Sequence, residues 1–210
     1  MNNYIDNLNW RYATKKFDAS KKISKENLEF LKEAMQLSAS SYGLQPYEIL
    51  IIEDQELRKK LKPAAWNQSQ ITEASHLIVI ANKVGFGDEL VDAYIQTMSD
   101  IRDVPLDSLE NAASFMKSKV GAFSSEEKAQ WTQNQSYIVL GNLLSAAAAI
   151  KVDVCSMEGF DAQAFNEILD LNNKGLNTAV IATGGYRSEE DQAPHYPKVR
   201  KRKEELFTTL

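Results

Sequence analysis

Two small groups of basic residues, one near each end of the chain, could hold a phosphate. Arg11 and Lys15 stand four positions apart, and Lys198 and Arg200 stand two apart. A four-residue spacing brings side chains together on a helix, and a two-residue spacing puts them on one face of an extended segment. Arginine grips phosphate oxygens through its planar guanidinium, and lysine adds a compact charge. Spacing alone leaves open the simpler alternative that all four are solvated surface charges.

A third feature is the segment 38–46, which is built of small and polar residues and ends in a proline. This composition predicts a loop. Ser40, Ser41 and the backbone around Gly43 would expose hydroxyl and amide groups there, and these groups could donate hydrogen bonds to a ligand.

Other kinds of site are disfavoured by the residues themselves. No Gly-x-Gly-x-x-Gly follows a predicted strand, and neither a Walker A sequence nor a Gly-x-Ser-x-Gly elbow is present. With two histidines and one cysteine, a clustered metal site is not expected. Cys155 lies in an apolar run without a basic neighbour and is predicted to be a buried structural thiol. His76, beside another apolar run, is predicted to be structural, and His195 is expected at the surface.

The bulk properties are those of a globular chain. Its 210 residues suit a single domain over 1–210, with an arm over 186–210. The net charge of −5 argues against a nucleic-acid partner. The longest apolar stretch, 138–150, is too short for a membrane span, which takes about 20 residues. No signal peptide is evident and a lone cysteine cannot form an internal disulfide, so a cytoplasmic protein is expected.

Apolar runs and capping residues outline the elements that must position the candidate groups. Strands are expected over 47–53, 77–81, 152–157 and 178–183, the last ended by two glycines. Helices are expected over 3–10, 68–74, 87–102 and 106–119, and after caps at Ser24, Asp54, Ser124 and Asp161.

Two of the helices carry information about packing. The helix after Ser24 has two adjacent apolar rows, which predict a wide core-facing stripe: Leu28, Leu31 and Met35, and Phe30, Ala34 and Leu37. The helix after Ser124 runs unbroken to 150, with Glu127 completing a capping box. Over 137–150 it is apolar or small on nearly every side, so it belongs at the centre of the protein or of a dimer.

In chain order, these segments resemble the motifs of FMN-dependent bacterial nitroreductases. The resemblance rests on Arg11-Tyr12-Ala13-Thr14-Lys15-Lys16-Phe17-Asp18, Ser40-Ser41-Tyr42-Gly43-Leu44-Gln45-Pro46-Tyr47, Asn67-Gln68-Ser69-Gln70 with Glu73-Ala74-Ser75-His76, Met157-Glu158-Gly159-Phe160-Asp161 and Pro197-Lys198-Val199-Arg200. These motifs follow the order found in the family and cover nearly the whole chain.

The resemblance implies an α+β fold with a central, mainly antiparallel sheet inside a helical shell. It also implies a homodimer with two FMN sites at the interface, in which the long apolar helix belongs to the interface. The C-terminal arm, 186–210, would be swapped, wrapping the partner and adding a strand to its sheet.

The resemblance assigns the predicted catalytic positions to Lys15, Glu158 and Gly159. Lys15 would lie beside N1 and the C2 carbonyl of the flavin, where a cation stabilises the reduced anion. The backbone amides of Glu158 and Gly159 would face N5, the hydride-accepting atom, and a glycine there allows close approach.

The other implied positions bind the cofactor. Arg11, Lys198 and Arg200 would hold the FMN phosphate, and Asn67 would hydrogen-bond the pyrimidine edge. Ser40, Ser41 and Gly43 would come from the other subunit. The remaining predicted contacts are Tyr12, Ala13, Gln70, Gln135, Ser156 and Met157.

Two single positions and one short run depart from the family pattern and mark a subgroup. Ala13 stands where some relatives have serine, and Gln70 stands where the better-known relatives have lysine. Lys15 would then be the main cation beside the pyrimidine ring. The run Tyr42-Gly43-Leu44 also differs from the Thr-Asn-Ser type of loop.

The implied function is an FMN-dependent NAD(P)H oxidoreductase that reduces nitroaromatics, quinones or similar small-molecule acceptors by ping-pong hydride transfer through N5. Two alternatives stay open. One is a flavoenzyme of the same fold with another reaction, such as enone reduction, dehalogenation or flavin fragmentation; the other is a non-catalytic FMN-binding dimer. No ribose-reading motif separates NADH from NADPH.

Overall fold

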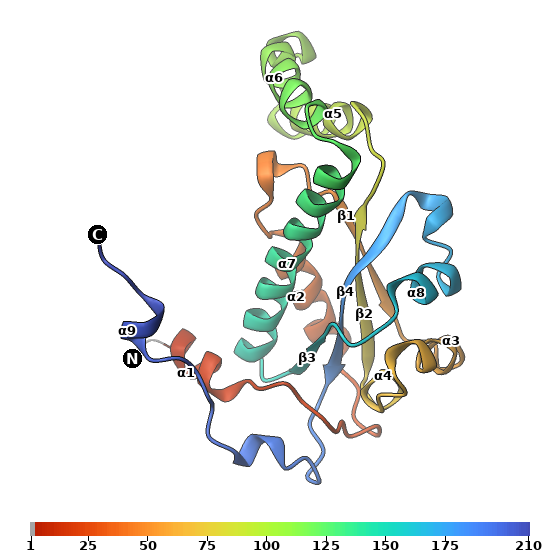
Figure 1. Cartoon of the computed structure of the whole chain (residues 1–210), viewed down its shortest axis with the longest axis vertical. Helices are drawn as coiled ribbons and strands as arrows, with labels where there is room; N and C mark the ends of the chain where they lie inside the picture. The colour runs from red at the N-terminus through yellow and green to blue at the C-terminus, as the bar shows by residue number, and fades with distance from the viewer. Residues whose placement is uncertain (1–2) are drawn as a thin grey trace.

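A four-stranded antiparallel sheet runs through the middle of the molecule (Figure 1). The structure, a computed structural model, describes residues 3–210. The strand order is β1-β2-β4-β3, and all three pairings are antiparallel. The strands are β1 (Tyr47–Ile52), β2 (His76–Lys83), β3 (Asp153–Met157) and β4 (Leu176–Gly185). The predicted α+β fold with an antiparallel sheet is therefore confirmed.

Helices cover both faces of the sheet, which explains why residues 77–81 of β2 are all apolar. Successive side chains of a strand point to opposite faces. Ile78 and Ile80 pack with α2 (Lys25–Gln36) and α7 (Ser125–Ala149). Leu77 and Val79 pack on the other face, which is covered by α3 (Gln55–Leu61), α4 (Gln70–Glu73) and α8 (Ala162–Ile168). A strand buried on both sides needs apolar residues at every position.

Helix α7 forms the spine of the molecule beside the sheet. Its capping box is present: Ser124 N donates to Glu127 Oε2 at 2.8 Å, and Glu127 N donates to Ser124 Oγ at 3.2 Å. With 25 residues, the helix is about 37 Å long. One row of its second half is buried against the sheet, including Val139 and Leu143, whereas Ile138 is exposed.

The predicted wide stripe of α2 is only half correct. Leu28, Leu31 and Met35 are buried as expected, but Phe30 is 43% exposed and Leu37 is 75% exposed. The sheet and α7 fill the space over the first row only. The second row stays at the surface of the single chain.

The two glycines that were predicted to end β4 belong to it instead. Gly184 pairs with Val154 and Gly185 pairs with Asp153. A Cβ built on Gly185 would lie 3.0 Å from both the Phe17 ring and the Ser75 backbone nitrogen. The glycine is needed because two other segments cross the strand here at close range. Helix α4, Gln70–Glu73, is also shorter than the predicted 68–74.

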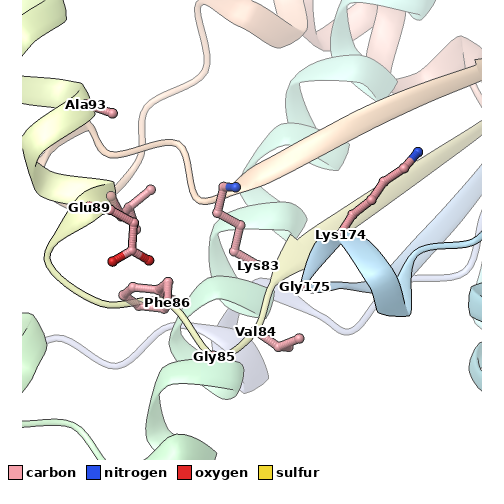
Figure 2. Close-up of a pocket in the computed structure, with 9 residues that line it drawn as sticks. Lys83, Val84, Gly85, Phe86, Glu89, Ala93, Lys174 and Gly175 are labelled. Atoms are coloured by element: carbon pink, nitrogen blue, oxygen red, sulfur yellow. The ribbon is translucent and has the colours of Figure 1, made fainter.

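Helices α5 (Glu89–Arg102) and α6 (Glu110–Gly121) project at one end of the molecule, beyond the N-terminal end of α7 (Figure 1). They share a small apolar cluster with Leu44 and Trp131. A pocket of about 350 Å³ lies between α5 and the end of β2, with Lys83, Phe86 and Glu89 on its walls (Figure 2). Gly85, at φ +67°, turns the chain from β2 towards α5.

The two ends of the chain lie side by side at the opposite end of the molecule. Helix α1 (Asn3–Trp10) packs on α7, and the strand-like segment after it pairs with the segment after β4. Asp18 N donates to Tyr186 O at 2.9 Å, and Ser188 N donates to Lys16 O at 3.0 Å. Part of the predicted arm, 186–200, therefore lies on its own chain, and only the segment with the short helix α9 (Lys203–Leu206) extends away (Figure 1).

Within residues 3–210, no helix has the length and apolar character needed to cross a membrane. In the same range, no group of three or more His, Cys, Asp and Glu side chains is arranged to hold a metal ion.

His76 is structural, as predicted, and it makes the stability of the fold depend on pH. Its ring is buried between Ser75 Oγ, 2.9 Å from Nδ1, and Glu53 Oε1, 3.3 Å from Nε2. Burial lowers the pKa of His76 below 6.5 and outweighs the opposing effect of the Glu53 carboxylate. The unfolded chain therefore binds a proton at a higher pH than the folded chain does.

We predict that the free energy of unfolding falls as the pH is lowered below about 6.5, and that His76→Asn reduces this fall. The contribution of His76 is fully present above the unfolded pKa and is lost as the pH drops through the lower folded pKa. Urea melts at pH 7.5 and 5.0 measure the effect, with the exposed His195→Asn as the matched control. An equal fall in both variants would contradict the prediction.

Candidate active site

Three cations from the two ends of the chain line one pocket of about 370 Å³. Arg11 follows α1, and Lys198 and Arg200 lie in the tail that returns beside it. The Lys198 ammonium donates to the backbone oxygen of Arg11 and, at 3.1 Å, to that of Leu8. Predicted residues Tyr12 and Ala13 line the same pocket. Of the four cations expected to converge, Arg11, Lys198 and Arg200 meet within a single chain, whereas Lys15 does not line this pocket.

Within the part of the chain that the structure describes, these cations have no acidic partner. None of the ion pairs formed within residues 3–210 includes Arg11, Lys198 or Arg200. Burial lowers the pKa of Lys198, and the charges of Arg11 and Arg200 lower it further. Burial and Arg200 likewise lower the pKa of Arg11. Three mutually repelling cations in one pocket fit a ligand with more than one negative charge, such as a phosphate monoester.

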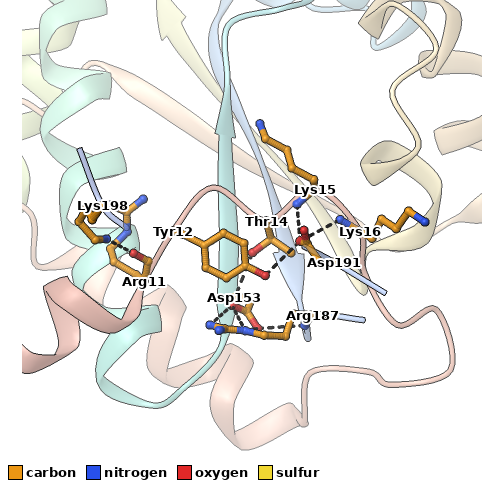
Figure 3. A network of polar contacts seen from close by, with 9 residues as sticks. All are labelled: Arg11, Tyr12, Thr14, Lys15, Lys16, Asp153, Arg187, Asp191 and Lys198. Atoms are coloured by element: carbon orange, nitrogen blue, oxygen red, sulfur yellow. Dashed lines mark hydrogen bonds and ion pairs between the residues drawn. The ribbon is translucent and has the colours of Figure 1, made fainter. Parts of the chain in front are cut away.

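Two carboxylates hold the segment between Arg11 and Lys15 in place (Figure 3). Asp191 accepts hydrogen bonds from the Tyr12 hydroxyl at 3.0 Å and from the Lys15 backbone nitrogen at 2.8 Å. Asp153 is bound by Arg187, whose Nη2 and Nε lie 2.6 Å and 3.0 Å from Oδ1. Sequence reasoning missed all three of these residues. A charged residue inside the apolar run of β3 was a signal for Asp153, and the tail gave no comparable signal for Asp191.

Arg187 also stacks between two aromatic rings. Its guanidinium carbon lies 4.3 Å from the centre of the Trp10 ring and 4.6 Å from that of Tyr12. Cation–π contact adds to the ion pair with Asp153. The polypeptide on either side of Arg11 is therefore tied to the segment that leads into the tail.

Strand β3 connects this region with the predicted catalytic glycine. Burial raises the pKa of Cys155, in the middle of β3, and the charges of Lys15 and then Arg11 counteract it, so both cations lie near that position. Cys155 is buried, as predicted. Beyond it lie Ser156, half-buried, and Met157, buried, both predicted contacts.

The loop after β3 packs against the loop that carries Asn67. Gln68 Nε2 donates to Gly159 O at 2.8 Å, and a Cβ on Gly159 would lie 2.8 Å from the Trp66 ring. Trp66 and Asn67 both have left-handed backbones, with φ of 54° and 56°. Trp66 is 70% exposed, so its ring forms an open wall beside Gly159. Sequence reasoning missed Trp66, although an aromatic residue directly before Asn67 was a possible signal.

The Glu158 side chain is bound to α7. The Tyr137 hydroxyl donates to Glu158 Oε1 at 2.5 Å. Burial and the Glu158 carboxylate raise the pKa of Tyr137 to about 12, so the phenol keeps its proton at neutral pH. This contact fixes Glu158 at the predicted hydride-accepting end. Gln70, by contrast, is buried in α4 and does not line the cation pocket.

The serine loop lies away from the cation pocket of its own chain. Ser41 N donates to Gln135 Oε1 at 2.8 Å, and a Cβ on Gly43, at φ +76°, would lie 2.7 Å from the Tyr94 hydroxyl. Helix α1, by contrast, meets α7 around Ser145. Gln135 and Ser145 are ten residues apart on α7, and ten helical residues span about 15 Å. Within one chain the structure does not bring Ser40, Ser41, Gly43 or Gln135 to the cations.

These features define an α+β protein with a pocket lined by three cations and a glycine loop near opposite ends of one edge strand. The chain belongs to the nitroreductase family, because the sequence pattern of that family matches residues 8–186. YfkO of Bacillus subtilis (strain 168), provisionally named an NAD(P)H nitroreductase, is 33% identical over 213 residues, covering 96% of this chain and 95% of YfkO.

Two further relatives support this assignment at the levels of sequence and fold. The major NAD(P)H-flavin oxidoreductase of Aliivibrio fischeri is 33% identical over 213 residues, which cover 98% of each chain. A crystal structure from Exiguobacterium sibiricum, described as that of a nitroreductase in complex with FMN, superposes with a TM-score of 0.85 at 19% identity, covering 99% of this chain and 97% of that one. At this identity, the structural match shows a shared fold.

We predict that Gly159→Ala displaces the Trp66 ring without unfolding the protein. The new methyl group would meet the indole at 2.8 Å, and an exposed side chain can move away at a cost of about 1 kcal/mol or less. Acrylamide quenching of tryptophan fluorescence should change, while the melting temperature should fall by only a few degrees, roughly 2–4 °C. Gly121→Ala, where nothing lies within 4 Å of the new methyl, is the control. Unchanged quenching would refute the proposed contact.

Proposed function

We propose that this protein is an FMN-dependent NAD(P)H oxidoreductase that reduces nitroaromatics, quinones or related electrophiles in a ping-pong cycle. The observation that carries the proposal is the order of groups along β3. The cations Arg11, Lys198 and Arg200 lie at its Asp153 end. The charge of Lys15 acts on the Cys155 thiol in its middle, and the Glu158–Gly159 loop follows its other end. The phosphate of FMN would meet the cations, the pyrimidine edge of its ring would meet Lys15, and N5 would meet the Glu158–Gly159 loop.

The phosphate end of FMN fits the pocket of Arg11, Lys198 and Arg200. A phosphate monoester carries close to two negative charges at neutral pH and accepts several hydrogen bonds. It would supply the counter-charge that the three cations lack. Lys15 would lie beside the pyrimidine ring, where its positive charge favours the reduced anionic form of the flavin. Asn67 would hydrogen-bond the same edge.

When bound, FMN supplies a hydride-accepting atom that no amino-acid side chain offers. The residues of this chain would orient the ring and shape the space above it. Tyr137 holds Glu158, and Gln68 holds Gly159, so the loop backbone is fixed from two sides. The exposed Trp66 ring would limit which flat acceptors can lie beside the flavin. The names of the B. subtilis and A. fischeri relatives, which specify NAD(P)H, support nicotinamide as the hydride donor.

We further propose that two copies of the chain form each site. The serine loop is separated along α7 from the cation pocket, so Ser40 and Ser41 can approach a flavin only from a second chain. Exposed apolar side chains mark the surface available for this contact: Phe30, Leu37 and Ile138 on α2 and α7, and Val199, Leu206 and Phe207 in the tail. A solvated monomer rarely leaves so many exposed together.

A groove of about 420 Å³ at the free edge of β1 suits the partner's arm. Met35, Tyr47, Ile49 and Ile51 line it, and β1 has a neighbour on one side only. An arm that adds a strand there would satisfy the unpaired backbone groups of β1. Acidic residues of α2, including Glu29 and Glu33, lie at an adjacent hollow and could meet the basic run 201–203.

The first prediction of this proposal concerns cofactor and reductant. Purified protein should bind FMN, and NADH or NADPH should bleach the bound flavin under anaerobic conditions, with an electrophilic acceptor restoring the absorbance. Lys198→Met should weaken FMN binding by about tenfold or more, because a charge-assisted hydrogen bond contributes roughly 1.5–3 kcal/mol. Protein that stays colourless with added FMN, or flavin that neither nucleotide bleaches, would overturn the proposal.

The second prediction concerns assembly. Ile138, 44% exposed on α7, would be buried in the dimer. Ile138→Asp should therefore weaken association by at least about a hundredfold, because a buried unpaired charge costs several kcal/mol. Ile168→Asp, on the opposite side of the sheet and 37% exposed, is the matched control. Sedimentation velocity distinguishes the species, and a monomeric wild-type protein would rule out the shared site.

A further inference from the structure

Asp191 is a buried carboxylate in the tail that collects four hydrogen bonds. Figure 3 shows it beside three of its partners, Tyr12, Lys15 and Lys16. It is 3% exposed. Its Oδ2 accepts from the Tyr12 hydroxyl at 3.0 Å, from Lys15 N at 2.8 Å and from Lys16 N at 3.2 Å. Its Oδ1 accepts from Ala193 N at 3.0 Å. All of these donors lie beside the cation pocket or within its walls.

The carboxylate is charged, yet it does not neutralise the cations of the pocket. Burial alone would raise the pKa of Asp191, but the hydrogen bonds from Ala193, Lys15, Lys16 and Tyr12 outweigh burial and hold the pKa below its ordinary value. No ion pair within residues 3–210 includes Asp191. A negative charge this close to an anion site would by itself weaken the binding of a phosphate.

Its contacts join the two segments that supply the cations. On one side, Asp191 accepts hydrogen bonds from the Tyr12 hydroxyl and from the backbone nitrogens of residues 15 and 16. All three donors lie in the segment that follows Arg11. On the other side it binds Ala193, in the short turn Ala193–His195 that leads to Lys198. The other clamp, Asp153 with Arg187, holds the chain before this turn and makes no such contact with it.

We propose that Asp191 is a positioning residue for the phosphate end of the cofactor site: it holds the segments bearing Arg11 and Lys198 at the spacing a phosphate monoester requires. The inference rests on the proposed binding of FMN and adds a residue that does not touch the ligand. The gain from fixing two cation-bearing segments exceeds the cost of placing one negative charge beside them.

A comparison of FMN with riboflavin, which lacks the phosphate, tests the inference. Dissociation constants are measured by quenching of flavin fluorescence for the wild-type protein and for Asp191→Asn. We expect the variant to lose at least about tenfold in affinity for FMN, as one or two charge-assisted hydrogen bonds would give, and to keep its riboflavin affinity within about threefold. A variant that is merely less stable would not change the ratio of the two constants.

Two further variants keep the test decisive. Glu190→Gln removes the same unit of charge from the neighbouring residue, whose carboxylate is exposed and paired with Lys16 at 3.0 Å. The affinity of this variant for FMN relative to riboflavin should match that of the wild type. If Asp191→Asn does not fold, Tyr12→Phe removes a single donor to the same carboxylate. This variant should lower the affinity for FMN relative to that for riboflavin by about threefold. Hydrogen exchange of the peptide covering 12–18 should be faster in both Asp191→Asn and Tyr12→Phe, whether or not flavin is present.

The outcomes separate this inference from the proposed function. A wild-type protein that binds FMN more tightly than riboflavin, with a variant that keeps the same ratio, overturns the role of Asp191 alone. Tighter FMN binding by Asp191→Asn overturns it as well, because repulsion would then outweigh positioning. A wild-type protein that binds neither flavin contradicts the proposed function and this inference together.

Discussion

The ion pair and hydrogen bonds that tie the two ends of the chain together are the interaction on which the candidate site depends. Arg187, stacked between Trp10 and Tyr12, binds Asp153 on the edge strand β3. Asp191 binds the amides of the N-terminal segment. Together with the backbone pairing of 16–18 with 186–188, these contacts hold residues nearly 190 positions apart in the sequence in one pocket, although the cations themselves repel one another. The two carboxylates take their partners from Arg187, from the Tyr12 hydroxyl and from backbone amides, so neither of them pairs with Arg11, Lys198 or Arg200 within residues 3–210.

The sheet order has a direct bearing on the site. Strand β3 lies at an edge, so one side of it is free of neighbouring strands. The segment 16–18 pairs with residues 186–188 beyond the end of β4, and the loop after β3 packs against the Trp66 loop. On the proposed function, an elongated ligand would lie along β3 with its charged end at the cation pocket and its flat end at Gly159. Helices on both faces keep the strand straight and fixed, since the core residues of the sheet are fully buried.

Local chemistry in the sequence predicted most of the fold, and the remainder depended on contacts between distant segments. The caps at Ser24, Ser124 and Asp161 and the apolar runs of the strands were sufficient to locate the elements, because they act within a few residues. The exposure of Phe30 and Leu37 was not predictable from periodicity, which reports an apolar row but not what covers it. The glycines inside β4 were misjudged because Phe17 and Ser75 cross there. At the candidate site, the motifs singled out Arg11, Lys198 and Gly159, whereas the positions of Asp191 and Trp66 depend on contacts between distant segments that no local pattern encodes.

The crowding of three like charges in one pocket has a consequence for the lifetime of the protein. A ligand that binds only the folded state stabilises it in proportion to the logarithm of its concentration relative to its dissociation constant. On the proposed function, loss of FMN would leave the three cations without a counter-charge. Their full mutual repulsion would then loosen the junction of the two termini. The tail would then be the first segment open to proteases, so turnover of this enzyme would follow the supply of flavin in the cell.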